Sequence, residues 1–338
     1  MEVTVAIPTH KNDGKTIFFT LQALSKQTFS DFSLLMAYKP SENDHTLDVV
    51  EKFTKELDIK VLIQSEGYLD EAMNSIYSAS KGDILITTDD DSVPSLNWVE
   101  AHVNAHEKHY DSGVLGPFSG LVRPSSFLRS IYGDIFEIPL ESDMRTFNNY
   151  FSKTGLLVRN HSLPRENYKV KTFNPIGVNM SVKREVYSDF RLLPMTIRGI
   201  NNEPYLCLHA YEKGLPCALI NDNLSVEHFD RDSMSRPKTL NGVIERFAEA
   251  SLSIYYLAKK GYTLDLRRLK MDLFFKSIPW RLRNNPLTKA QLQGIMTGIK
   301  ISLYALKENK DEVWIRNTLK QIQGGKLDPI EIAGNFNA

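Results

Sequence analysis

Three aspartates in a row, Asp89, Asp90 and Asp91, directly follow the apolar run at residues 84–88. Adjacent carboxylates repel one another, and the short connection to Pro94 keeps them close together. Solvated acids at a strand end are one explanation, which fits two aspartates better than three. A divalent cation is the other, because it removes the repulsion and because Mg²⁺ typically takes one or two protein carboxylates together with substrate phosphates and water. In a strand-end loop, Asp89 and Asp91 can point to one side while Asp90 points away.

The elements that must position this triplet form a regular series. Apolar runs typical of strands lie at residues 3–8, 32–38, 60–64 and 83–88, and helical patterns fill 14–28, 43–57 and 69–80. This alternation predicts a parallel sheet with helices on both faces, and such sheets bind ligands beyond the carboxyl ends of their strands. The candidate binding residues near those ends are Pro8, Thr9, His10, Lys39, Ser65 and Gly67, with Asn74 on the helix after the third strand.

Five stretches share features with one enzyme family. The first, VAIPTHKNDGKTIFFTLQALSKQTFSDFSLLM, combines a strand ending in Pro-Thr with a helix that ends in Gln-Thr. The others follow in order: EGYLDEAMNSIYSASKGDILITTDDDSVPSLNW, NPIGVNMSVKREVY, NNEPYLCLHAYEKG and LSVEHF. Over residues 3–229 they resemble the family 2 inverting glycosyltransferases. The resemblance implies a GT-A fold, a Rossmann-like mixed and mainly parallel sheet flanked by helices. It also implies metal-dependent transfer of a sugar, with inversion, from a nucleotide-diphosphate donor to an acceptor hydroxyl.

The resemblance assigns roles around the cation, which we expect to be Mn²⁺ or Mg²⁺. Asp89 and Asp91 match the family's Asp-x-Asp pair, with Asp91 as the direct ligand and Asp89 nearer the ribose or a metal-bound water. Asp90, behind the pair, either tolerates substitution or touches the base or ribose. His228 matches the histidine that completes the metal or diphosphate site, and a neutral imidazole is a reasonable ligand for Mn²⁺. Without the resemblance, a lone histidine at a strand end would be interpreted as structural.

A second assignment concerns the catalytic base. Glu203 occupies the place of the family's catalytic carboxylate and would take the proton from the acceptor hydroxyl. The alternative is an ordinary acidic residue in the first turn of a helix, favoured by the helix dipole. The preceding Asn202 stands where the family usually has an acid. Asn179 belongs to the stretch that resembles the family's Gly-x-Asn-Met segment and is a candidate for donor binding.

One departure from the family leaves the donor base open. The second strand usually ends in Asp-Asp-Gly-Ser, where a carboxylate recognises the base, but here the place reads Tyr38, Lys39, Pro40 and Ser41. Either another acid, Glu42 or Asp44, takes over this task or the nucleotide differs. The polar loop after His228 either closes over the donor diphosphate or links two domains; its basic residues are Arg231, Arg236 and Lys238.

The bulk composition is that of an ordinary globular protein. Of 338 residues, 42% are hydrophobic and 24% charged, and 41 basic residues balance 41 acidic ones, so charge gives no reason to expect nucleic acid as a partner. The two cysteines, Cys207 and Cys217, allow neither a disulfide framework nor a zinc pattern. Because we find no secretory signal and no transmembrane segment, we expect a cytoplasmic protein, with a peripheral position at the inner face of the membrane as an option.

We expect a catalytic domain at residues 1–235 and an all-helical region at 236–338. Within the latter, residues 267–283 carry six basic residues and one acid, interleaved with apolar residues. This pattern fits peripheral membrane contact, which would suit a lipid-linked acceptor, but a core-facing helix with a cationic outer side is the commoner arrangement. Similarly, His102, His106 and His109 lie at helical spacing, and we expect a solvated helix face, since no acid or cysteine accompanies them.

Two other functions stay open at this stage. A sugar nucleotidyltransferase would need a glycine-rich basic loop after the first strand, of which PTHKNDGK is a poor version. A non-catalytic sugar- or lipid-binding protein could retain the same fold, and the departure at Asn202 is its best support. The sugar, the acceptor (a glycan or lipid-linked glycan) and the oligomeric state are not readable from the sequence.

Overall fold

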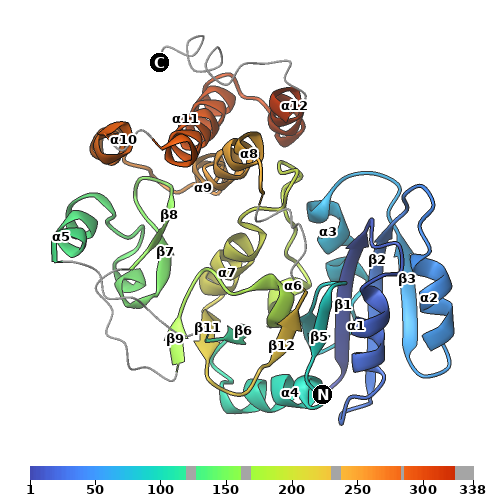
Figure 1. Ribbon diagram of the computed structural model, residues 1–338. Coiled ribbons are helices and arrows are strands. Elements are labelled where there is room, and N and C mark those ends of the chain that lie inside the picture. The colour runs from blue at the N-terminus through green and yellow to red at the C-terminus, as the bar shows by residue number, and fades with distance from the viewer. Residues whose placement is uncertain (119–126, 161–168, 230–236, 283–284, 324–338) are drawn as a thin grey trace. The chain divides into compact units, whose positions relative to one another are not determined.

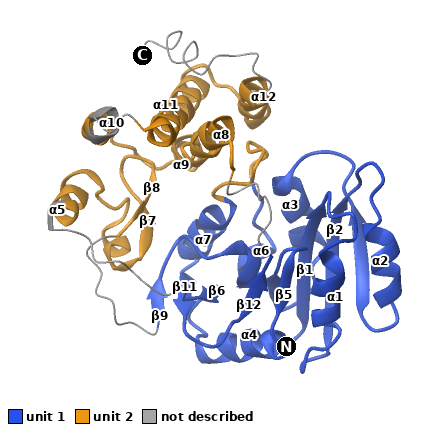
Figure 2. Ribbon diagram, in the orientation of Figure 1, with its two compact units in different colours: residues 1–121, 165–192, 202–231 blue, residues 122–164, 193–201, 232–338 orange. Residues whose placement is uncertain are grey.

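The computed structural model describes residues 1–118, 127–160, 169–229, 237–282 and 285–323. The chain forms two compact units (Figure 2). Unit 1 comprises residues 1–121, 165–192 and 202–231, and unit 2 comprises 122–164, 193–201 and 232–338. Unit 2 therefore includes, beside the C-terminal helices, two segments that the expected division at residue 235 places in the catalytic domain.

Unit 1 is built on an eight-stranded sheet with the order β3-β2-β1-β4-β10-β6-β11-β9 (Figure 1). Its strands are β1 (Val3–His10), β2 (Phe32–Lys39), β3 (Asp58–Ile63), β4 (Ile84–Thr87), β6 (Val114–Pro117), β9 (Lys169–Lys171), β10 (Met180–Lys183) and β11 (Cys217–Ile220). Strands β1 to β4 pair in parallel, as do β6 and β11. Strand β10 runs antiparallel to β4 and β6, and β9 antiparallel to β11. The predicted mixed, mainly parallel sheet is confirmed.

The register brings the ends of the central strands together. In β1, Val3 lies opposite Phe32 of β2 and Ile84 of β4, so the strands begin at one level. Apolar residues on these strands, such as Ile7 and Leu34, are fully buried, as expected for strands covered on both faces. The segments that follow β1, β2 and β4 consequently leave the sheet at the same edge.

Helices and a small second sheet flank this core. The helices of unit 1 are α1 (Ile17–Leu24), α2 (Thr46–Phe53), α3 (Leu69–Ala79), α4 (Trp98–Lys108), α6 (Arg184–Tyr187) and α7 (Asn202–Glu212), with the 3₁₀ turn η2 (Gly177–Asn179). The short strand β5 (Ser92–Pro94) pairs antiparallel with β12 (Val226–His228). Strands β11 and β12, which follow one another in the chain, therefore belong to different sheets.

Unit 2 contains most of the long helices. Its elements are α5 (Phe127–Phe136), η1 (Ser142–Thr146), β7 (Asn149–Phe151), β8 (Leu157–Arg159), α8 (Leu240–Ala250), α9 (Ser253–Lys259), α10 (Leu266–Leu282), α11 (Pro286–Lys307) and α12 (Glu312–Gln323). The predicted helical C-terminal region is confirmed, although its first apolar run forms two helices, α8 and α9. Helix α11 lies directly on α8, since a Cβ atom at Gly298 would stand 2.1 Å from the carbonyl oxygen of Ala248. None of the helices in the described segments combines the length and hydrophobicity that a bilayer crossing requires.

Candidate active site

The aspartate triplet lies in the tight connection between β4 and β5. The amide of Thr88 still donates to Ala6 of β1 at 3.1 Å, which holds the connection to the sheet. The hydroxyl of Ser92 donates to the carbonyl oxygen of Asp89 at 2.8 Å, and Thr20 of α1 donates to the carbonyl oxygen of Ser92 at 2.7 Å. These bonds fix the loop backbone, so the positions of the carboxylates are set by the sheet and by α1.

Strand β12 brings His228 to this loop. His228 lies opposite Ser92 in the β12–β5 pair, and the amide of Phe229 donates to the carbonyl oxygen of Asp91 at 2.9 Å. The imidazole Nε2 is 3.2 Å from Oδ1 of Asp91 and 3.5 Å from Oδ2 of Asp89. The hydrogen bond to Asp89 and the charges of both aspartates raise the pKa of His228, against the opposing effect of partial burial.

These three side chains have the chemistry of a divalent cation site. One ligand atom from each of Asp89, Asp91 and His228 lies within 4.8 Å of the others. Two carboxylate oxygens and one imidazole nitrogen suit Mn²⁺ well and Mg²⁺ acceptably. The side chain of Asp91 is only 10% exposed, whereas that of Asp89 is 44% exposed. The residues therefore fit such an ion, with Asp91 as the more rigid ligand.

The middle aspartate makes different contacts. Thr9, at the end of β1, donates its hydroxyl to Oδ2 of Asp90 at 2.5 Å. Asn12 donates from its amide to the carbonyl oxygen of Asp90 at 3.0 Å. The Oδ1 atom of Asn12 accepts the amides of Thr16 and Ile17, both at 3.2 Å. The sequence interpretation missed Asn12, which lies in the turn before α1 and binds both the start of that helix and the aspartate loop.

Glu203 begins helix α7 and approaches η2 closely. A Cβ atom at Gly177 would stand 2.2 Å from Oε1 of Glu203, so the glycine leaves room for this carboxyl group in its present position. Gly177 is held in turn by Thr87 of β4, which donates to its carbonyl oxygen at 2.6 Å. Burial raises the pKa of Glu203 to about 7, and the negative charge of Asp89 acts in the same direction. The residue is thus a carboxyl group that can exchange a proton near neutral pH.

A buried polar network supports η2 from behind. The Oδ1 atom of Asn179 accepts from Trp98 at 2.9 Å and lies 3.0 Å from Nε2 of His102, while its Nδ2 donates to the carbonyl oxygen of Leu224 at 2.8 Å. Both ends of the Asn179 amide are therefore occupied within the protein. Its expected contact with the donor stays a prediction, and its observed contacts are those of a positioning residue.

The expectation of a solvated histidine face on α4 is wrong. His102 and His106 are buried, and both ring systems lie 2.9 Å from the hydroxyl of Ser181 on β10. Burial lowers the pKa of His102 to about 4 and that of His106 to about 3, so both stay neutral. His109 contacts the carboxylate of Asp222 at 2.6 Å. Helical spacing alone could not show that this side of α4 packs on β4 and β6.

Lys39 joins the ends of two strands at the expected base-binding edge. Its Nζ donates to the carbonyl oxygen of Gly67 at 2.5 Å and lies 5.1 Å from the centre of the Tyr68 ring. Nδ1 of His10 is 3.2 Å from the carbonyl oxygen of Lys39. Asp44, one of the substitutes considered for the family's acid, accepts from Ser41 at 2.9 Å.

The remaining candidates differ in how free they are to bind a ligand. Both ends of the Asn74 amide bind the backbone of Leu192, at 2.9 and 2.8 Å. Pro8 is a half-buried residue of β1, and Ser65 is exposed after β3. Arg231 and Arg236 lie outside the described residues.

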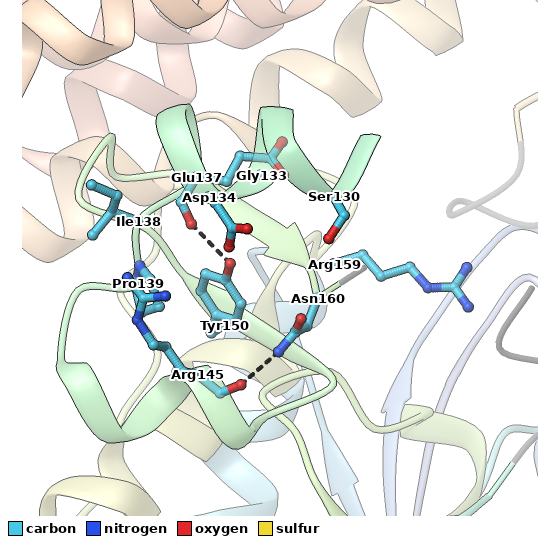
Figure 3. A pocket seen from close by; sticks show the side chains of 10 residues that line it. All are labelled: Ser130, Gly133, Asp134, Glu137, Ile138, Pro139, Arg145, Tyr150, Arg159 and Asn160. Carbon is cyan, nitrogen blue, oxygen red and sulfur yellow. Dashed lines mark hydrogen bonds between the residues drawn. The ribbon is translucent and has the colours of Figure 1, made fainter. Parts of the chain in front are cut away.

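A separate cavity of about 70 Å³ lies in unit 2, between α5, η1, β7 and β8 (Figure 3). Asp134 and Tyr150 contribute to its wall, and Asn160 closes one side by donating to the carbonyl oxygen of Arg145 at 2.7 Å. The side chains of its two arginines, Arg145 and Arg159, point to opposite sides in Figure 3. They do not converge on a common ligand position, and we assign the cavity no chemistry.

Comparison with known proteins identifies the family. Residues 4–190 match the family described as Glycosyl transferase family 2. A comparison with curated proteins found no match.

Several solved structures share the fold. S. aureus TarS 1-349 is 15% identical with a TM-score of 0.53, and covers 96% of this chain and 87% of its own. Its complex with UDP-GlcNAc is 16% identical with a TM-score of 0.51, covering 96% and 92%. Mannosyltransferase PcManGT from Pyrobaculum calidifontis, in complex with GDP-Man and Mn2+, is 14% identical with a TM-score of 0.50, covering 95% and 85%. The expected GT-A fold is confirmed, and because the family match spans more than half of the chain, the protein belongs to glycosyl transferase family 2.

Proposed function

We propose that this glycosyltransferase moves a sugar from a nucleotide-diphosphate donor to an acceptor hydroxyl with inversion, and that it requires Mn²⁺ or Mg²⁺. The observation that carries the proposal is the carboxyl group of Glu203, which has a pKa of about 7 and responds to the charge of Asp89. A proton-accepting group near an acidic, metal-compatible cluster is what a single displacement needs.

Glu203 acts as the general base in this reaction. The acceptor oxygen attacks the anomeric carbon on the side opposite the diphosphate, and its proton passes to Glu203. The bond from the anomeric carbon to the diphosphate oxygen breaks, and the nucleoside diphosphate leaves with that electron pair. One displacement inverts the anomeric centre. Glycine at 177 leaves room for the carboxyl group in this position, since a Cβ atom there would stand 2.2 Å from its Oε1 atom.

Asp91, Asp89 and His228 are the residues that would hold the cation. A bound Mn²⁺ or Mg²⁺ would offset the negative charge that develops on the leaving diphosphate. Asp91 is held most firmly, because its backbone carbonyl also binds Phe229. The positive shift in the pKa of His228 has the two aspartates as its cause, so a cation in this place would compete with the proton on the imidazole.

The donor nucleotide would lie along the edge formed by the ends of β1, β2 and β3. His10, Lys39 and Gly67 are linked there by the contacts described above, and Thr9 contacts Asp90. The candidate set is completed by Pro8, Ser65, Asn74, Asp90 and Asn179. We further propose that Arg231 and Arg236 contact the diphosphate. The base stays open, because the Lys39 amine replaces the acid expected there, and the similar structures carry uridine in one case and guanosine in the other.

We propose that the acceptor hydroxyl belongs to a glycan or to a lipid-linked glycan. A lipid-linked acceptor would bring the enzyme to the inner face of a membrane as a peripheral cytoplasmic protein. Residues 267–283 are the candidate contact.

The experiment is a thermal-shift panel of nucleotide sugars, with and without Mn²⁺. A ligand that binds only the folded state raises its apparent stability. We expect one nucleotide sugar to raise the midpoint only when Mn²⁺ is present. An equal shift without the cation would contradict the metal dependence. Release of pyrophosphate from a nucleoside triphosphate and a sugar phosphate would instead identify a nucleotidyltransferase.

A further inference from the structure

Helix α10 exposes several large apolar side chains and buries the charged side chain of Asp272. Phe274 is 60% exposed, Met271 49%, Phe275 45% and Ile278 40%, whereas Asp272 is completely buried. Surface helices of globular proteins usually show the opposite arrangement. The expected core-facing apolar side is present, since Leu269 is buried in a cluster with Ile254 and Ile299, and Arg267 and Lys270 are exposed as expected for the cationic outer side. The large apolar side chains on that outer side were not expected.

Helix α5 extends the exposed surface. The two helices pack against each other: the Tyr132 hydroxyl donates to Asp272, and the Ile135 carbonyl oxygen accepts from Arg268. Ile131 and Ile135 of α5 are 40% and 50% exposed. The rings of Phe136 and Phe275 lie 5.1 Å apart and join the helices. We call this surface the apolar face; it consists of Ile131, Ile135, Met271, Phe274, Phe275 and Ile278.

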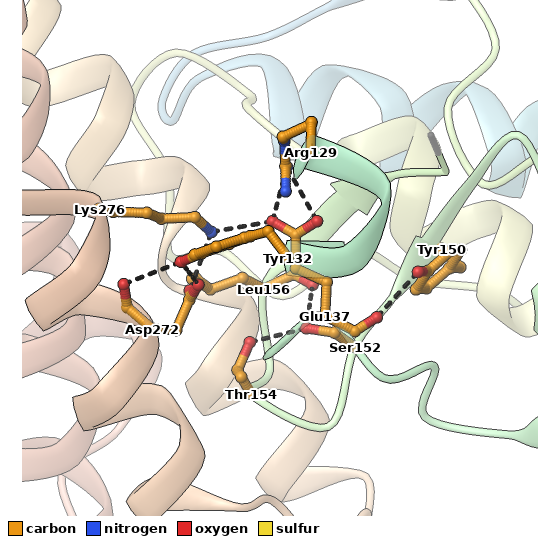
Figure 4. Close-up of polar contacts among 9 residues, drawn as sticks. All are labelled: Arg129, Tyr132, Glu137, Tyr150, Ser152, Thr154, Leu156, Asp272 and Lys276. Atoms are coloured by element: carbon orange, nitrogen blue, oxygen red, sulfur yellow. Dashed lines mark hydrogen bonds and ion pairs between the residues drawn. The ribbon is translucent and has the colours of Figure 1, made fainter. Parts of the chain in front are cut away.

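A buried polar network holds the helices in this orientation (Figure 4). Glu137, at the end of α5, accepts from Arg129 at 2.8 and 2.9 Å. The Nζ of Lys276 lies 3.1 Å from Glu137 and 2.8 Å from Asp272. Turning α10 inward to cover its phenylalanines would break these contacts and leave buried charges without partners, which is strongly unfavourable. The exposure of the apolar face is thus fixed by the network behind it.

The charged residues beside the apolar face indicate what kind of partner it can bind. Arg267 and Lys270 are exposed on α10 next to Met271 and Phe274, and Asp134 of α5 is the exposed acid beside the isoleucines. Contiguous apolar surface of this kind marks an interaction site. Aromatic and aliphatic side chains accompanied by basic residues fit the boundary between anionic headgroups and acyl chains.

We propose that α5 and α10 form a docking surface for an anionic lipid bilayer. The apolar face enters the headgroup boundary, with Phe274 and Met271 foremost, while Arg267 and Lys270 bind lipid phosphates. The proposal includes α5, which the sequence pattern at 267–283 did not indicate. It is independent of the sugar-transfer reaction, so lipid binding and catalysis can fail separately.

Vesicle flotation of the full chain tests this surface. We expect binding to vesicles of phosphatidylglycerol and phosphatidylcholine, and at most weak binding to phosphatidylcholine alone. The double variant Met271→Glu/Phe274→Glu should lower partitioning at least about tenfold, because it places carboxylates in the apolar boundary. Arg267→Gln/Lys270→Gln should weaken binding to anionic vesicles by about fivefold per charge and leave neutral vesicles unaffected.

A matched control removes equally exposed apolar groups from unit 1. Leu96 is 60% and Tyr110 76% exposed, and Leu96→Glu/Tyr110→Glu should bind vesicles as the unaltered chain does. All variants should unfold at nearly the same temperature, since the substituted side chains are exposed. The proposal is overturned if the unaltered chain does not bind anionic vesicles, or if Met271→Glu/Phe274→Glu binds them equally well. A concentration-dependent dimer in ultracentrifugation, abolished by the same variant, would assign the face to a second copy of the chain instead.

Discussion

Two glutamates, Glu137 buried in unit 2 and Glu203 half-buried in unit 1, have pKa values shifted in opposite directions. Glu137 in unit 2 has Arg129 and Lys276 as partners; burial acts to raise its pKa, but the two cations outweigh burial and hold the pKa below its usual value. Glu203 in unit 1 lies against Gly177, and both burial and the charge of Asp89 raise its pKa to about 7. The same side chain is thus a fixed anion in one unit and a proton acceptor in the other.

The difference separates structural from functional acids. A carboxylate compensated by basic side chains stabilises packing and does not titrate near neutral pH. A carboxyl group whose surroundings disfavour its charge costs stability, and such groups cluster at functional sites. On this criterion Glu137 belongs to the framework of α5 and α10, while Glu203 is the candidate for the proposed general base.

The largest effect is expected for Glu203→Gln. The amide cannot accept the proton of the acceptor hydroxyl, so kcat should fall by roughly 10²–10⁴-fold. Affinity for the nucleotide sugar, measured by calorimetry, should change little. Glu137→Gln serves as the matched substitution and should retain activity at a temperature where it is folded. Near-normal turnover of Glu203→Gln would remove the base assignment.

Glu137→Gln, in contrast, is expected to lower the stability of the fold. Removing this charge leaves Arg129 and Lys276 without their common anion, and breaking a buried ion pair typically costs about 3–5 kcal/mol. Chemical denaturation should show a loss of that order in the free energy of unfolding. Glu107→Gln, on the exposed side of α4, should be neutral. A loss no larger than that of the control would show that the network does not hold α10 in place.

Substitutions of Asp91 and Asp89 should differ in their effect on the affinity of the proposed cation site. Asp91→Asn should reduce Mn²⁺ affinity at least about a hundredfold, because it removes a charged ligand that is largely buried. Asp89→Asn should have a smaller effect, since that side chain is 44% exposed. Calorimetric titration with Mn²⁺ in the presence of a nucleoside diphosphate measures both, with Asp58→Asn as a control at the far end of β3. Unchanged affinity in Asp91→Asn would exclude it as a ligand.

The smallest effects concern pH. Activity should fall about tenfold per pH unit once the pH is below the pKa of Glu203, which is about 7. A bound cation would offset the charge of Asp89 and so lower this pKa. Because folding raises the pKa of Glu203, its ionisation costs stability as pH rises from about 4.5 to 7. Glu203→Gln should therefore be more stable than the unaltered chain at pH 8, by at most about 3 kcal/mol, and equal to it at pH 4. A flat activity profile from pH 5 to 8 would contradict the role of this group.

The first half of unit 1 was predictable because its signals are local. Each of β1 to β4 is a short apolar run, and helical spacing marks the segments between them. The antiparallel insertion of β10 between β4 and β6 was not predictable, because strand order depends on partners far away in the chain. The break between α8 and α9 was also missed, since Ser251 and Leu252 carry no proline or glycine signal.

The candidate site, like the fold, was predictable from the sequence only in part. The sequence indicated Asp89, Asp91, Glu203 and His228 through residue type and family resemblance, and the structure places Asp89, Asp91 and His228 together. The polar partners of Asn179 and Asn74 could not be anticipated, because an asparagine in a sequence looks alike whether it meets a ligand or a backbone. Burial of Asp272 was equally hidden, since its partners, Lys276 of α10 and Tyr132 of α5, come from two helices.

The pairing of β12 with β5 would also decide when the proposed cation site is completed during synthesis. The ribosome delivers the two aspartates early, together with the local strands and helices of the sheet, whereas His228 follows only after the whole middle of the chain has been translated. Segments that pair over such distances assemble late, because long loops must close first. A nascent chain that stops short of β12 should therefore hold the aspartate loop in its sheet without the third ligand. Metal affinity would then arise in a single late step, when the strand that bears His228 is added.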